Sequence, residues 1–176
     1  MSSVSLEELA LAYVARFATT AQGLARYCRR KLRERGWEGQ EEGEPSPDVA
    51  AIVERFVANR YVDDGEFARA RTGSLLRRGY GMRRVGQALD AAGVAGEDRE
   101  EVSDAALRDA ALRMAKKRRF GPFGADGAPP GDRAVREKQI AAMLRAGHGL
   151  DTARRLVEAP DADAVLKWVE EAREEG

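Results

Sequence analysis

Three stretches of the chain share one pattern, an amphipathic run that closes on a large apolar residue four positions before a glycine. The three pairs are Leu32 with Gly36, Leu89 with Gly93, and Met143 with Gly147, and they recur at nearly equal intervals. A glycine directly after a helix adopts the left-handed backbone conformation that ends it without a steric penalty. Each glycine therefore predicts the end of a central helix, and the recurrence predicts tandem helical repeats.

The overall composition favours helices over strands. Of the 176 residues, 43% are hydrophobic, 34% are charged and only 6% are aromatic, a profile typical of many small helix contacts. No apolar run approaches the roughly 18 residues that span a bilayer, and the N-terminus lacks the layout of a secretory signal. The one cysteine, Cys28, excludes an internal disulfide. We therefore expect an all-α, soluble protein that resides in the cytoplasm.

Helix-start signals divide the chain further. Ser5 and Glu8 have the Ser-x-x-Glu spacing of a capping box, and Thr19 and Gln22 predict a second one. These signals and the recurring glycines together predict three repeats of three helices each. The predicted repeats are residues 1–60, residues 61–104, and residues 105–176 with an additional C-terminal helix.

The junction between the first two repeats carries the stretch YVDDGEFA. Tyr61 is followed here by the acids Asp63, Asp64 and Glu66. Asp63 and Glu66 have the spacing of a capping box, in which side-chain oxygens accept the free backbone N–H groups of a helix start. The alternative is a catalytic or metal-binding cluster, but a metal needs more ligands within reach than this stretch supplies. We expect these residues to build the repeat junction, and we expect no bound metal.

The formal net charge is zero because 30 basic residues balance 30 acidic ones, yet the two signs are separated along the chain. Basic and acidic stretches alternate three times, so the zero is a cancellation and strong local fields remain. The basic stretches supply the candidate binding residues, which are Arg29 and Arg30 in the first repeat, Arg77, Arg78, Arg83 and Arg84 in the second, and Lys116, Lys117, Arg118 and Arg119 in the third.

Each basic patch has a functional and a structural interpretation. The four arginines of the second repeat surround Gly79 and Gly81, so we place them on a turn where guanidinium groups suit phosphate or carboxylate recognition. A solvated helix junction is the alternative. The third patch ends a predicted helix, where cations also stabilise the helix dipole, and the first patch alternatively forms a solvated face. Few aromatic residues accompany these patches, so we do not expect the base stacking of single-strand binders.

No set of catalytic residues is evident. Cys28 lies on an apolar stripe, where we expect a buried small hydrophobe. The single histidine, His148, follows Gly147 at a predicted helix end, and we expect it to have a structural role. The glycines lack the Gly-Lys-Ser/Thr signature of a phosphate loop, which disfavours an ATPase. We therefore expect no catalytic residue and no cofactor.

Several segments together resemble the RecX family, the small helical regulators of the RecA recombinase. They are "YVDD", "RRGYGMRRV" and "ALDAAGV" between Val53 and Val94, with "CRRKLRERGW" before them and "KKRRFGPF" and "EKQIAAMLRAGH" after them. The chain departs from the family pattern at Arg60, where the family usually has glycine before the aromatic residue. It departs again in the acidic insertion at 38–44 and in the acidic tail after Pro160.

The resemblance implies tandem three-helix repeats that form an elongated, curved module without catalytic activity. It also implies a partner, the RecA–single-stranded DNA filament, in whose groove such proteins lodge and damp ATP hydrolysis, strand exchange and self-cleavage of the SOS repressor. DNA phosphates would then be contacted through the filament. The alternative is a DNA-binding or adaptor module that acts without RecA, and an enzyme is a distant third. We expect a monomer with no membrane partner.

Overall fold

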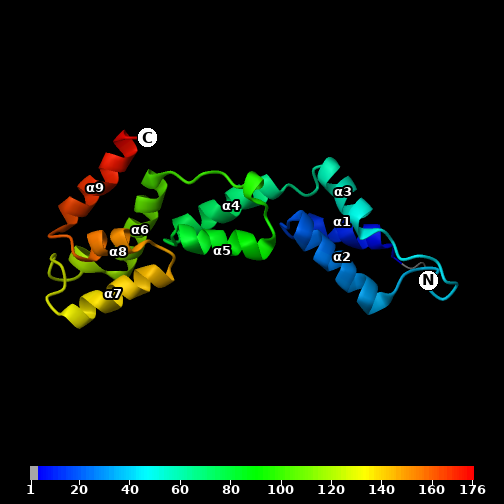
Figure 1. Ribbon diagram of the computed structural model, residues 1–176, viewed down its shortest axis with the longest axis horizontal. Coiled ribbons are helices and arrows are strands. Elements are labelled where there is room, and N and C mark those ends of the chain that lie inside the picture. Colours follow the sequence, from blue (N-terminus) through cyan, green and yellow to red (C-terminus); the bar gives the residue numbers. More distant parts are fainter. Residues whose placement is uncertain (1–3) are drawn as a thin grey trace. The chain divides into compact units, whose positions relative to one another are not determined.

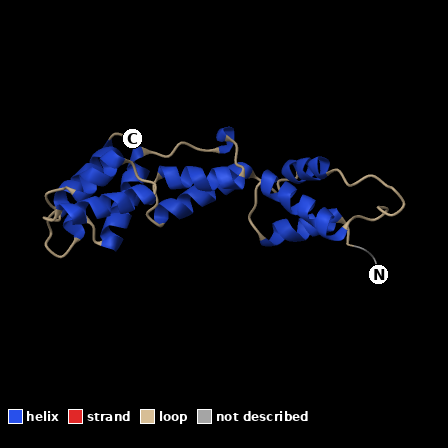
Figure 2. Ribbon diagram, turned by 60° about the horizontal axis from the view of Figure 1, so that its bottom comes forward, coloured by secondary structure: helices blue, strands red, loops and turns tan. Residues whose placement is uncertain are grey.

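A computed structural model of the chain describes residues 4–176, and within that range it consists of helices joined by turns and loops, with no strand (Figure 2). The all-α class predicted from the sequence is confirmed. Backbone contacts group the residues into two compact units. The first unit comprises the chain up to Arg69 together with Leu89–Glu100, and the second comprises Ala70–Ala88 and Glu101–Gly176.

Three helices form most of the first unit, namely α1 (Leu6–Arg16), α2 (Ala21–Arg35) and α3 (Val49–Ala58) (Figure 1). Their apolar faces meet in a buried cluster made of Ala10, Leu24, Cys28, Val49, Ile52 and Phe56, which Val62 joins from the segment after α3. Because these residues recur at helical spacing in the sequence, each helix buries one face and leaves its charged face in solvent. Burial raises the pKa of the Cys28 thiol, which agrees with the predicted role of a small hydrophobe.

The starts of the first two helices test the capping predictions. At α1, Ser5 and Glu8 form the predicted capping box, with reciprocal backbone bonds of 3.2 Å and 2.7 Å. At α2 the prediction is wrong by one residue, because Thr20 is the capping residue and its hydroxyl accepts the Gly23 N–H at 3.0 Å. The same hydroxyl donates to the carbonyl oxygen of Ala92 at 2.5 Å. A distant backbone acceptor therefore selects Thr20 over Thr19.

The end of α3 explains the departure at Arg60. Arg60 has a left-handed backbone with φ 58°, its N–H bonds the Val57 carbonyl at 3.0 Å, and the Tyr61 N–H bonds the Phe56 carbonyl at 2.9 Å. These two bonds define a Schellman motif, which normally places glycine at the left-handed position. The accompanying apolar contact is present as well, since the rings of Phe56 and Tyr61 meet edge to face at 5.5 Å.

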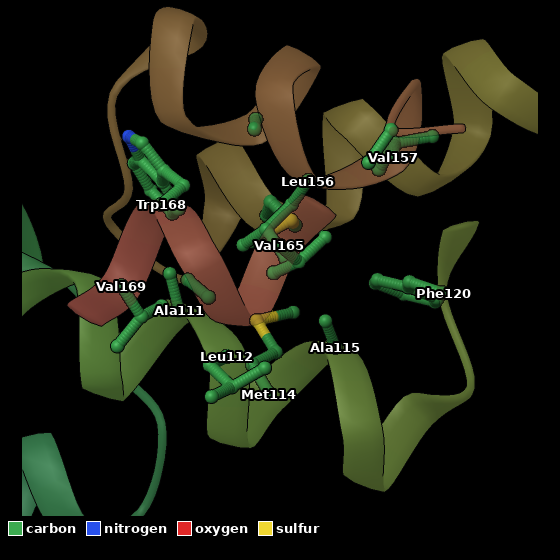
Figure 3. Close-up of a cluster of buried hydrophobic side chains, with 14 of the residues drawn as sticks. Ala111, Leu112, Met114, Ala115, Phe120, Leu156, Val157, Val165, Trp168 and Val169 are labelled. Atoms are coloured by element: carbon green, nitrogen blue, oxygen red, sulfur yellow. The ribbon is translucent and has the colours of Figure 1, made fainter. Parts of the chain in front are cut away.

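Helices α4 (Asp64–Arg77) and α5 (Met82–Ala92) contribute residues to both units. The second unit further contains α6 (Asp104–Arg118), α7 (Arg133–Arg145), α8 (Leu150–Val157) and α9 (Ala162–Glu174). Figure 3 shows the core that α6, α8 and α9 share, with the side chains of Trp168, Val165, Leu156, Ala111 and Met114 gathered between the helices. Met143 of α7 is also fully buried in this cluster.

The predicted helix-ending glycines are confirmed. Gly36, Gly93 and Gly147 follow α2, α5 and α7 and have φ values of 69°, 76° and 97°. Between α5 and α6, the chain contains only a short 3₁₀ turn, Gly96–Asp98, and the predicted boundary at 104/105 falls in the first turn of α6. The division into three repeats of three helices remains a prediction, since contacts group the chain into two units instead.

Candidate functional site

In the second unit, the turn between α4 and α5 is fastened to the loop between α7 and α8. The Gly81 N–H donates to the Ala146 carbonyl at 2.9 Å, and the Arg83 N–H donates to the Gly147 carbonyl at 3.2 Å. A β-carbon at Gly81 would collide with the Gly147 carbonyl, so only glycine permits this approach. The His148 ring, 6% exposed, places Nε2 2.8 Å from the Gly79 carbonyl oxygen. Burial lowers the pKa of His148.

This attachment brings the ends of three helices around one cavity of about 290 Å³, here called the basic cleft. Its charged lining residues are Arg78, Lys117, Arg118 and Arg145, and no acidic side chain within residues 4–176 lines it. Tyr80 lies in the lining beside two guanidinium groups, with Arg78 Cζ 5.2 Å and Arg84 Cζ 5.7 Å from its ring centroid. Four cations from three separate segments of the chain thus face one open cavity.

None of the four charged lining residues forms an ion pair with an acid within residues 4–176. Elsewhere in the same unit arginines are paired, for example Arg173 with Asp109 at 2.7 Å. Unopposed like charges in one concave site repel one another and raise the local concentration of anions. The arrangement therefore suits an anionic ligand, and planar guanidinium groups beside an aromatic ring suit phosphate.

The remaining candidates of the second and third patches lie nearby but outside the cleft lining. Arg77, Lys116 and Arg119 are exposed at or just after the ends of α4 and α6, and Arg83 and Arg84 are exposed in the first turn of α5. Conversely, Arg145 lines the cleft although the sequence did not single it out. A lone arginine at the end of an amphipathic helix carries no local signal, and only the attachment of the loop to the α4–α5 turn reveals its position.

The first unit has a second basic concavity of about 540 Å³, here called the arginine groove. Arg26, Arg29, Arg30 and Arg33 of α2 line it, together with Tyr13 and Tyr27, and no acid of the described part of the chain does so. The two tyrosine rings stack with centroids 4.0 Å apart and an interplanar angle of 11°. The sequence shows few aromatic residues beside its basic patches, but folding pairs α1 with α2 and thereby gathers two rings next to Arg29 and Arg30.

The acidic residues of the junction are engaged in helix starts. Asp63 accepts the Glu66 N–H at 2.9 Å, whereas the Glu66 carboxylate pairs with Arg69 at 2.6 Å instead of returning to the Asp63 backbone. Asp64 accepts the N–H of Ala21, the first residue of α2, at 2.8 Å. Burial raises the pKa of Asp64, and nearby carboxylates reinforce that shift. Each of the three acids therefore has a partner in the protein, while Tyr61 is 54% exposed.

No group of three or more histidine, cysteine, aspartate or glutamate side chains within residues 4–176 is placed to hold a metal ion. None of the helices there combines the length and the apolar character needed to cross a membrane.

Comparison with known proteins assigns the chain to a family. The family model described as the second three-helix domain of RecX matches residues 63–102, the range that contains the α4–α5 turn. The regulatory protein RecX of Myxococcus xanthus is 33% identical over 169 residues, which cover 92% of this chain and 89% of the relative. The chain belongs to the RecX family. The regulatory protein RecX of Halorhodospira halophila is 30% identical over 164 residues, or 92% of each chain.

The basic cleft lies only partly within the range that the RecX family model matches. The chain is a RecX-family regulatory protein, and the matched range carries two of the cleft's aromatic and charged residues, Arg78 and Tyr80. Lys117, Arg118 and Arg145 come from helices outside that range. The cleft therefore combines the matched RecX domain with the C-terminal part of the chain.

Proposed function

We propose that this RecX-family chain is a non-catalytic regulator that binds the RecA–single-stranded DNA filament and damps its ATPase, recombinase and SOS co-protease activities. It acts as a monomer in the cytoplasm, where it contributes to the control of recombination and DNA repair. The basic cleft carries the proposal, because four unpaired cations from three helix ends face one cavity without an opposing acid. DNA phosphates within the filament supply the matching negative charge.

The chemistry of the chain's two most reactive side chains supports a binding role over a catalytic one. Cys28 is fully buried in the core of the first unit, where burial raises the pKa of its thiol. His148 is buried in the second unit, and its ring bonds a backbone carbonyl. A nucleophile and a general base must reach a substrate, whereas both of these groups serve the packing of their own unit.

The experiment that tests the proposal removes cleft charge and compares it with charge removed elsewhere from the same helices. Lys117→Glu with Arg145→Glu reverses one charge on α6 and one on α7 inside the cleft. Arg113→Glu with Lys138→Glu makes the same change in charge on the same two helices, at exposed positions outside the cleft. All four residues lack an ion pair within residues 4–176, so both variants should fold.

The readout is inhibition of RecA ATPase on single-stranded DNA. We expect the cleft variant to inhibit at least about tenfold less well. The slope of the logarithm of its apparent affinity against the logarithm of the salt concentration should be shallower by about one to two units. The control variant should inhibit like the wild type. The sequence-based variant Arg77→Glu with Arg83→Glu should also weaken inhibition, but less, because these side chains flank the cleft without lining it. Tight binding of the wild type to naked DNA without any effect on ATP hydrolysis would instead favour a module that acts without RecA.

A further inference from the structure

The arginine groove of the first unit differs from the basic cleft because two stacked aromatic rings, Tyr13 and Tyr27, form part of its wall, whereas a single tyrosine lines the cleft. Arg26, Arg30 and Arg33 recur at helical spacing along α2, so they lie on the face that also presents Tyr27. Tyr13 reaches this face from α1 and stacks on Tyr27. Cations and flat apolar surface therefore meet in one concavity, which a purely electrostatic contact with phosphates does not require.

The charges in this groove are available to a ligand. Arg29 and Arg33 form no hydrogen bond or ion pair within residues 4–176, and both are exposed. Arg30 has only a distant partner, Glu34, at 3.6 Å. The side chain of Arg26 is held in place by its bond to the Ala91 carbonyl at 3.0 Å, which fixes one guanidinium group at the edge of the groove.

The aromatic wall continues to the surface. Phe17 lies next to Tyr13 with a centroid distance of 5.3 Å, and it is 56% exposed. On the other side of the pair, the Arg30 guanidinium carbon lies 5.5 Å from the centroid of the Tyr27 ring. Phe17, Tyr13, Tyr27 and Arg30 thus follow one another, with Tyr13 and Tyr27 stacked and the Phe17 ring tilted by 39° against Tyr13. Aromatic rings beside cations bind unpaired bases because every base offers a flat π-face.

We propose that the arginine groove is a nucleotide site, in which Arg29 and Arg33 bind phosphate while the base packs against the Tyr13–Tyr27 pair. The ligand is an unpaired nucleotide within a strand, which presents an anionic phosphate next to an accessible base, and a free nucleoside triphosphate carries the same two groups. This inference deepens the proposed nucleic-acid contact of the chain, on which it rests. It adds recognition of bases to the neutralisation of phosphates.

The test uses the full chain without RecA, so that it is separate from the inhibition assay. Fluorescence anisotropy follows a dye-labelled pentathymidylate, and the unlabelled competitors are pentathymidylate, an abasic strand of the same length, ATP and inorganic phosphate. Because stacking strengthens binding by a large factor per base, the abasic strand should compete at least about fivefold less well than pentathymidylate. Displacement by ATP shows that a free nucleotide also fits the site, and displacement by strands alone shows that the site requires an unpaired nucleotide within a strand.

Matched variants locate the site. Arg29→Gln with Arg33→Gln should weaken the binding of both strands at least about tenfold, whereas Arg16→Gln with Arg35→Gln removes the same charge from the first unit outside the groove and should have little effect. Tyr27→Leu should reduce the preference for pentathymidylate over the abasic strand to less than about twofold. Tyr27→Phe retains the ring and should preserve that preference.

Three results would overturn the inference. They are no binding of pentathymidylate to the wild-type protein, equal displacement of the labelled strand by pentathymidylate and the abasic strand, or an equal loss of strand affinity in the groove variant and its control. The strand comparison uses wild-type protein, so it remains decisive even where Tyr27→Leu fails to fold. The inference and the proposed function can fail independently. A chain that inhibits RecA through the basic cleft yet binds the two strands equally well would lose only the nucleotide site.

Discussion

His148 Nε2 lies 2.8 Å from the carbonyl oxygen of Gly79, so a side chain in the α7–α8 loop fixes the turn between α4 and α5. A carbonyl oxygen only accepts hydrogen bonds, and the ring therefore carries its proton on Nε2. The turn presents Arg78 and Tyr80, and the loop follows directly after Arg145. The single histidine of this RecX-family chain thus helps to shape the basic cleft.

The first prediction concerns pH. Burial holds the pKa of His148 below its unfolded value of about 6.5, so the neutral ring is favoured in the folded state. Above that pH the ring is neutral in both states and its contribution to stability is complete. As the pH falls through 6.5, the unfolded chain takes up a proton first, and the free energy of unfolding decreases. Urea unfolding at pH 7.5 and 5.5 should show this loss in the wild type.

Two variants separate titration from hydrogen bonding at this position. His148→Gln retains an N–H donor but does not titrate, so it should lose less stability between pH 7.5 and 5.5 than the wild type. His148→Leu leaves the Gly79 carbonyl without its partner and should cost about 1–3 kcal/mol already at pH 7.5. An equal pH-dependent loss in His148→Gln and the wild type would show that other groups cause it.

The sequence predicted those features that depend on neighbouring residues. Periodic apolar positions indicated the helices, and the glycines after α2, α5 and α7 marked their ends, because left-handed termination is a local property. The cap of α2 was misplaced, since Thr19 and Thr20 both have acceptable local spacing. The Ala92 carbonyl decides between them, and no pattern within α2 reveals a contact with the end of α5.

The candidate site was predictable to a similar extent. Charge density along the chain singled out Arg78, Lys117 and Arg118, which the fold brings together in the basic cleft. It could not single out Arg145, which has no basic neighbour in sequence. It also could not foresee that Tyr13 stacks on Tyr27, because the contact depends on the packing of two helices. The density of charged residues along the sequence identifies basic patches, whereas the packing of the helices decides which residues of a patch share a concave surface.

The second prediction tests the close approach at Gly81. Gly81→Ala should destabilise the chain by about 2 kcal/mol or more, because its β-carbon would lie 2.6 Å from the His148 backbone nitrogen and would collide with the Gly147 carbonyl. Gly86→Ala provides the control, since this glycine lies within α5 and a β-carbon there meets no atom within 4 Å. It should stabilise by up to about 1 kcal/mol through helix propensity. Similar unfolding midpoints in urea for both variants would contradict the proposed constraint.

The third prediction concerns the left-handed residue after α3. Arg60→Gly should raise the free energy of unfolding by about 1 kcal/mol, because φ 58° is strained for a residue with a β-carbon and unstrained for glycine. Arg60→Ala removes the same charge but retains the β-carbon, so it should not show the gain. The difference between the two variants in thermal or urea unfolding isolates the backbone effect. If alanine stabilises as much as glycine, the gain comes from charge removal instead.

The fourth prediction concerns Thr20, whose hydroxyl joins the start of α2 to the end of α5 within the first unit. Thr20→Val preserves the shape of the side chain but leaves the Gly23 N–H and the Ala92 carbonyl without this partner, at a cost of about 1–3 kcal/mol. Thr20→Ser keeps the hydroxyl and should cost less. Cys28 supplies a readout specific to this unit, because its thiol is buried, its pKa is raised, and reaction with a disulfide reagent requires opening.

Under conditions where opening is fast and reversible, the rate of Cys28 labelling reports the equilibrium population of the open unit. A loss of 1–3 kcal/mol then corresponds to labelling that is about 5 to 150 times faster in Thr20→Val than in the wild type, with Thr20→Ser between them. Labelling of Thr20→Val at the wild-type rate would mean that solvent satisfies both backbone groups once the hydroxyl is lost. The end of α5 would then be held to the first unit by the remaining contacts of α2, among them the bond from Arg26 to the Ala91 carbonyl.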